Sequence, residues 1–179
     1  MRRSLLVAVA LAGCVSASSV AEAQFQTDTD SQNFIVAVPG NVQIIAPADA
    51  LIVHDQTDND QVFPVQQWDV RGNVLTGVTA TFQVAQPFIH SIDPTLMRDA
   101  ELDVAIGSTI GPAVWSVGGT GNDVTDYING DNDASVSVNS TFVGHALIDL
   151  TVTFRTVAFA QVMAGSYDTT VIGTVTENP

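Results

Sequence analysis

Residues 145–155 read HALIDLTVTFR, and apolar side chains occupy every second position from residue 146 to residue 154. The positions between them carry mostly polar side chains, among them Asp149 and Thr151. Successive side chains of a β-strand point to opposite faces of its sheet, so this period of two predicts a half-buried strand. Residues 164–176, AGSYDTTVIGTVT, form a turn and a second alternating run. Two long strands with apolar faces need a partner sheet to cover them, which predicts an all-β fold.

Strand-like runs recur through the rest of the chain, separated by Gly, Pro, Asn and Asp, as in sandwiches and barrels. They fall at residues 34–38, 42–46, 62–70, 78–84, 102–106, 113–117 and 136–138. Pro64 predicts an edge or a bulge in its run, and a single helical turn is expected at 93–99. The sequence therefore predicts one antiparallel β-sandwich, immunoglobulin-like or jelly-roll-like, over residues 34–179. Its expected core includes Trp68, Phe82, Trp115, Leu150, Val152 and Phe154, with Leu150 and Val152 the most buried.

The end of the chain also resembles a known family. Ala164-Gly165-Ser166-Tyr167, followed by Thr170-Val171 and Thr174-Val175, is similar to the closing hairpin of secreted bacterial spore-coat-U-like and pilin-like β-sandwich proteins. These proteins finish with an A-G-x-Y segment and a last strand in which Thr and Val alternate. The resemblance implies a sandwich fold and points to assembly by strand exchange.

The N-terminus has the three parts of an export signal. Arg2 and Arg3 precede a short apolar run, and Ala21-Glu22-Ala23 fits the small-residue cleavage rule. We expect a signal peptide over residues 1–23, a mature start at Gln24 and a flexible acidic arm over residues 24–33. In the alternative, Leu11-Ala12-Gly13-Cys14 is a lipobox, and the lipid-modified Cys14 anchors the protein. In both cases the protein is exported, to the periplasm, the cell surface or the medium.

Composition excludes several classes of partner. The 179-residue chain has a formal net charge of −14 and no lysine. A field of this sign repels phosphate backbones, so nucleic-acid binding is not expected. The apolar run of the leader is too short to cross a bilayer, and no later stretch is long enough, so no membrane span is expected.

Acidic and amide side chains crowd two short segments. The first holds Asn122, Asp123, Asp126, Asn129, Asp131 and Asp133, and the second holds Asp55, Asp58, Asn59 and Asp60. Calcium takes six to eight hard oxygen ligands, which such segments supply. We name Asp123, Asp126, Asn129, Asp131 and Asp133 as candidate calcium ligands. The competing interpretation is that these residues form turns, since Asp and Asn side chains bond the local backbone. No other cofactor is expected.

Enzymatic chemistry has little support in the sequence. Without its leader the chain has neither cysteine nor lysine, and His54, His90 and His145 occur in no metal-binding spacing. His54 and Asp55 are adjacent, but neighbours on a strand point to opposite faces and make a poor dyad. We expect no enzyme. One interpretation of the aromatic residues Trp68, Trp115 and Tyr127 is a platform on which a sugar ring stacks. The other interpretation is that they fill the core.

The function predicted first is an exported structural or interaction module of the bacterial cell envelope or extracellular space, with protein partners or copies of itself. The alternative is a calcium-dependent or carbohydrate-binding module. Self-assembly has a candidate donor, because the polar arm leads into the β-prone residues 34–38, which can add to the sheet edge of a neighbour. In the competing arrangement, residues 34–38 form the first strand of their own sandwich.

Overall fold

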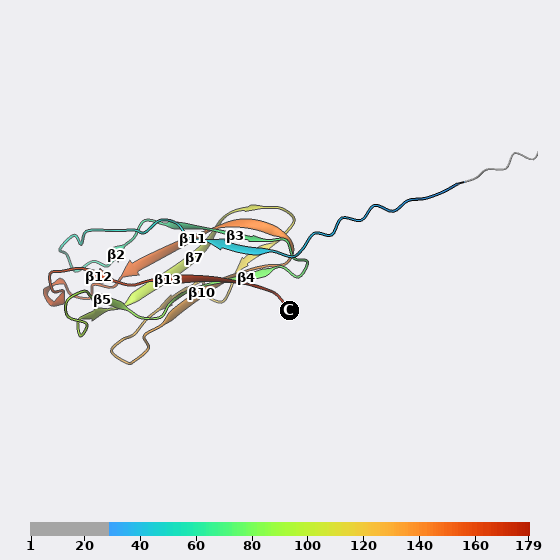
Figure 1. The fold of residues 1–179 in the computed structure, drawn as a ribbon. Coiled ribbons are helices and arrows are strands. Elements are labelled where there is room, and N and C mark those ends of the chain that lie inside the picture. The colour runs from blue at the N-terminus through green and yellow to red at the C-terminus, as the bar shows by residue number, and fades with distance from the viewer. Residues whose placement is uncertain (1–28) are drawn as a thin grey trace, which may run out of the picture. The chain divides into compact units, whose positions relative to one another are not determined.

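The computed structural model describes residues 29–179, and its regular secondary structure is almost entirely β-strand (Figure 1). The predicted signal peptide, both alternative processing sites and the first residues of the acidic arm lie outside the described residues. The strands are β1 (Val42–Ile45), β2 (Gln61–Val62), β3 (Gln66–Gly72), β4 (Val78–Val84), β5 (Phe88–His90), β6 (Met97–Arg98), β7 (Ala100–Ile110), β8 (Trp115–Val117), β9 (Asn122–Val124), β10 (Ala134–Ser140), β11 (Gly144–Phe154), β12 (Tyr167–Asp168) and β13 (Val171–Glu177). One short 3-10 helix, η1 (Phe159–Gln161), separates β11 from β12.

The strands form three antiparallel sheets. The first has the order β1-β3-β11-β7-β9, and β2 also pairs with β11. The second has the order β13-β4-β10-β8, and the third has the order β12-β5-β6. The prediction of an all-β, antiparallel fold is therefore confirmed. No helix among residues 29–179 has the length and apolar character needed to cross a membrane.

β11 lies in the middle of the first sheet, as its alternation predicts. It pairs with β3 and β2 on one side and with β7 along its whole length on the other. Its register with β7 shifts between Leu147 and Ile148, where Gly107 is the extra residue of a β-bulge. Every apolar position of the alternation, from Ala146 to Phe154, is buried. The long strand thus presents one continuous apolar face to the core.

The core draws side chains from all three sheets. Trp68 and Leu150 come from the first sheet, Phe82 from the second and Phe88 from the third. The rings of Trp68 and Phe82 meet edge to face at 5.2 Å, so the apolar faces of the first and second sheets are in contact. All six predicted core residues are buried. Phe82 and Leu150 are the most buried of the six, whereas Val152 is the most exposed of them, so that part of the prediction is wrong.

Gly173 interrupts the alternation of the last strand for a steric reason. A Cβ atom at this position would lie 2.6 Å from Cζ3 of Trp68 and 2.8 Å from Cδ1 of Ile44. The indole ring of Trp68 occupies the space that a side chain on β13 would need. The alternating run therefore contains a glycine where the largest core side chain of the opposite sheet approaches the backbone.

Three local predictions are wrong. The expected helical turn at 93–99 is a turn followed by β6, because the Asp93 carboxylate accepts hydrogen bonds from the N–H and hydroxyl of Thr95. The expected strand at 62–70 is divided into β2 and β3 around Pro64. Residues 34–38 form no strand, and their large apolar side chains are 74–88% exposed. Residues 29–37 belong to an N-terminal unit, distinct from the compact unit Val38–Pro179.

Candidate functional site

The predicted calcium ligands lie on β9 and on the turn that follows it. The Asp123 carboxylate accepts hydrogen bonds from the N–H groups of Val124 and Ser135, at 3.0 and 2.8 Å. Asp126 and Asp131 pair through their backbones, and the Asp126 carboxylate accepts two hydrogen bonds from Asn129. The loop brings Asp126, Asn129 and Asp131 together in one tight turn.

These carboxylates are arranged as turn formers. Asp123 is bonded to the start of β10, outside the turn that holds Asp126, and Asp133 is exposed. Within residues 29–179, no three His, Cys, Asp or Glu side chains are placed to share one metal ion. Gly130 follows Asn129 in this turn and lies in the left-handed region at φ 83°, as is typical of an Asn-Gly turn. Calcium binding at this loop stays a prediction.

A second concave site is a mostly apolar groove of about 840 Å³, which no sequence pattern predicts. Two chain segments line it, residues 46–54 after β1 and residues 162–171 around β12. Core side chains from all three sheets also line it, including Trp68, Phe88, Leu150, Val152, Phe154 and Val171. The groove therefore lies where the three sheets meet, with the hydrophobic core on its inner side.

Residues 46–54 leave one wall of this groove with free backbone groups. β1 ends at Ile45, and the chain then continues to His54 without joining a sheet. Among the described residues, no backbone–backbone hydrogen bond involves residues 46–54. An extended segment with unpaired N–H and C=O groups beside an apolar hollow is a template for one more strand.

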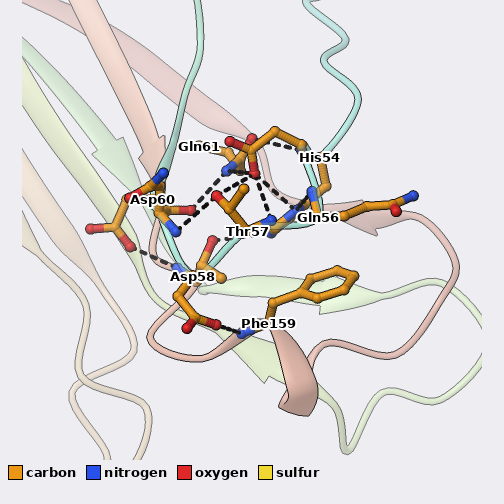
Figure 2. A network of polar contacts seen from close by, with 10 residues as sticks. His54, Gln56, Thr57, Asp58, Asp60, Gln61 and Phe159 are labelled. Atoms are coloured by element: carbon orange, nitrogen blue, oxygen red, sulfur yellow. Dashed lines mark hydrogen bonds and ion pairs between the residues drawn. The ribbon is translucent and has the colours of Figure 1, made fainter.

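A polar loop, drawn in Figure 2, contributes Gln56 and Gln61 to the lining of the groove. The Asp55 carboxylate is its centre and accepts hydrogen bonds from the N–H and hydroxyl of Thr57 and from Nε2 of Gln61. Gln61 is buried and also donates to the carbonyl of Asn59. The bonds from Thr57 lower the pKa of the Asp55 carboxyl below its usual value, so Asp55 is ionised at neutral pH. The Asp55 carboxylate and the buried Gln61 amide therefore join the two ends of the loop.

Two further carboxylates fasten this loop to the chain after β11. Asp58 accepts a hydrogen bond from the Phe159 N–H, a contact visible in Figure 2. Asp60 accepts one from the Thr156 N–H at 2.8 Å and pairs with Arg155, which also pairs with Glu101. The second predicted acidic segment thus has a structural role, since its carboxylates satisfy backbone donors of the loop around η1.

His54 has no free nitrogen with which to act as a catalytic base. Its Nδ1 accepts a hydrogen bond from the Gln56 N–H at 3.0 Å, and its Nε2 lies 3.1 Å from Oγ1 of Thr156. The ring also packs against Phe154 and Phe159. Its nearest approach to Asp55 is 3.7 Å, longer than a hydrogen bond. His54 therefore joins the groove wall to the end of β11.

The three aromatic residues proposed as a sugar platform are not presented together on the surface. Trp68 and Trp115 are buried members of the core, and Tyr127 lies in the turn after β9. Each indole is 8% exposed and offers too little surface to a sugar ring, which favours the core-filler interpretation for the two tryptophans, whereas Tyr127 is not part of the core.

Sequence reasoning misses the groove because its walls consist of segments that form no regular strand. A signal for one wall is present in the sequence, since Leu51-Ile52-Val53 is apolar yet follows a proline and an acidic residue. Leu51 and Val53 point outward and are almost fully exposed, while Ile52 and His54 are half-buried.

Comparison of the chain with protein-family models, with curated proteins and with solved structures finds no match.

Proposed function

We propose that the chain is an exported, non-enzymatic interaction module of the bacterial cell envelope or extracellular space, built as a single β-sandwich that associates with copies of itself. The observation that carries this proposal is the exposure of Phe34, Ile35, Val36 and Val38, which are 74–88% accessible. Contiguous apolar side chains exposed on a protein mark a site of association. The similarity of residues 164–175 to pilin-like proteins supports the same function.

The composition agrees with a module that acts outside the cell. Few of its residues are charged, 13% against about a quarter in average proteins. Lysine is missing, and threonine, serine and asparagine are frequent on the strand faces turned away from the core. The leader over residues 1–23, or alternatively the lipid anchor at Cys14, would place the domain beyond the inner membrane.

Self-association is tested on the chain that starts at Gln24. Sedimentation equilibrium across a hundredfold range of concentration is expected to give a mass that rises above that of one chain. The association should persist in high salt, because it depends on uncharged side chains rather than on ion pairs. A constant monomer mass at every concentration would contradict self-association and leave association with a different protein as the remaining form of the proposal.

The second candidate is a calcium-dependent module, favoured by the turn that gathers Asp126, Asn129 and Asp131. If calcium binds there, titration calorimetry with millimolar calcium should give measurable heat, and the melting temperature should rise relative to chelator. The Asp131→Asn variant should weaken both effects, while Asp103→Asn on β7 is the matched control. Equal responses of the two variants, or no heat at all, would leave these residues as turn formers.

A further inference from the structure

We propose that the apolar groove binds a small amphiphilic molecule that has a hydrophobic body and a positively charged end, such as an ammonium group. The proposal concerns a ligand and does not depend on self-association. The volume of the groove, about 840 Å³, lies within the range of about 300–1,000 Å³ that is typical of small-molecule sites. Residues 46–54 and 162–171 form its walls, and core side chains form its inner side.

The groove presents apolar side chains that the domain itself covers only in part. Four of them, Ile52, Phe159, Tyr167 and Val171, are half-buried, and Met163 is 57% exposed. A hydrophobic body that covers these side chains removes apolar surface from water, which is the main favourable contribution to binding of this kind. The groove thus offers one contiguous surface to the apolar part of a ligand.

The charged groups that line the groove are both carboxylates. Asp49 lies on the first wall and Asp168 on the second, and no arginine or lysine of the described chain lines either wall. His54 accepts a hydrogen bond at Nδ1 from the Gln56 N–H and is therefore neutral. The formal net charge of the whole chain, −14, has the same sign. The groove accordingly attracts a cationic ligand and repels an anionic one.

Both carboxylates can accept further hydrogen bonds. Asp49 is exposed, and within residues 29–179 its side chain has neither a hydrogen bond nor an ion pair. Asp168 accepts one hydrogen bond, from the Ser166 hydroxyl at 3.0 Å. By contrast, Asp55 and Asp60 of the polar loop are bonded to several groups of their own chain. A hydrogen bond between a carboxylate and an ammonium group is stronger than one between neutral partners, because both partners are ionised.

An ammonium group also suits the backbone of the first wall. The carbonyl groups of residues 46–54 accept no backbone–backbone hydrogen bond from any described residue. A primary ammonium donates up to three hydrogen bonds and accepts none, so it can bond a carboxylate and such carbonyls together. A carboxylate-headed or purely apolar ligand would leave these acceptors to water. The wall therefore favours a cationic head that is rich in donors.

Three ligands with the same alkyl chain test the inference on the protein that starts at Gln24: octylammonium, 1-octanol and octanoate. Each is titrated below its micelle concentration into isotopically labelled protein, and the shifts of assigned backbone amides give the affinity and the place of binding. Octylammonium should bind at least tenfold more tightly than octanoate, with octanol between them. The amides that move should be those of residues 46–54 and 162–171. High salt should lower the affinity for octylammonium toward that for octanol.

Four variants separate the charge of the groove from its apolar surface. Asp49→Asn and Asp168→Asn should each lower the preference for octylammonium over octanol at least threefold. Asp133→Asn, which removes an exposed carboxylate outside the groove, should leave that preference unchanged. Ala48→Trp fills the groove from an exposed position on its wall and should weaken all three ligands at least fivefold. Its matched control is a further variant, Ala105→Trp, at an exposed position of β7 outside the groove, which should bind as wild type does.

Equal affinities for octylammonium and octanoate would overturn the inference. So would equal effects of Asp133→Asn and the two groove carboxylate variants, or amide shifts confined to other surfaces. If none of the three ligands binds up to its solubility, the inference also fails, and a polypeptide is the remaining occupant to test. None of these outcomes bears on self-association, which sedimentation equilibrium measures separately.

Discussion

The Leu150→Ala variant is expected to lose about 2–5 kcal/mol of unfolding free energy, the range seen for leucine truncations in cores. Leu150 is 1% exposed and lies at the middle of β11, opposite Val104 of β7 and Gln66 of β3. Truncation removes buried methyl groups and leaves a hollow that neighbouring strands cannot close without breaking their ladders. The loss is measured by urea unfolding of the wild type and the variant under identical conditions.

Leu75→Ala provides the matched control for this substitution. Leu75 is 73% exposed in the loop before β4, so the same change in chemistry removes little buried surface. Its effect should stay within about 0.5 kcal/mol, as at most surface positions. Equal losses at the two leucines would mean that β11 does not form the centre of the core.

Most of the strands could be predicted because each carries its own signal. On β4 and β10 the alternation of buried and exposed residues is complete, and on β11 it runs from Ala146 to Val152. A period of two specifies both the strand and the face that is buried. Pro64 predicts an irregularity in the run 62–70 but not its full division into β2 and β3, since proline cannot donate to a ladder. The turn at Gly130 follows from the Asn-Gly dipeptide. These features depend on a few neighbouring residues, which is why sequence alone is sufficient.

The groove and the exposed segment depend on partners distant in the chain. Residues 34–38 have the β-branched and aromatic composition of a strand, but composition does not name the strand that would pair with them. Residues 46–54 likewise join no sheet. Whether such a run joins a sheet is decided by the packing of the whole domain.

The polar loop beside the groove is recognisably acidic and turn-forming in the sequence, but its contacts could not be predicted. Asp58 and Asp60 bond backbone groups about a hundred positions later in the chain, at Phe159 and Thr156. The pairing of β2 with β11 brings these distant segments together. An aspartate in a loop has the same local sequence signal whether it faces water or satisfies a distant N–H group.

The second large effect is expected at Gly77, in the turn before β4. Its φ of +77° lies in the left-handed region, and a Cβ atom here would lie 2.1 Å from the carbonyl oxygen of Ser140. That carbonyl also accepts a hydrogen bond from the side chain of Asn178, and the Asn178 N–H donates to the Gly77 carbonyl. Gly77 thus sits at a junction that holds the ends of β4, β10 and β13 together.

Gly77→Ala should therefore cost more than the backbone conformation alone. A non-glycine residue in the left-handed region costs about 1–2 kcal/mol, and the clash with the Ser140 backbone adds about 1–3 kcal/mol of overpacking. Gly119→Ala separates the two contributions, because Gly119 has a φ of +60° and a Cβ atom added there would meet no atom within 4 Å. Urea unfolding should show a loss of about 2–5 kcal/mol for Gly77→Ala and only the conformational part for Gly119→Ala. Equal losses would show that strain at φ, and not the approach of β10, makes glycine necessary at position 77.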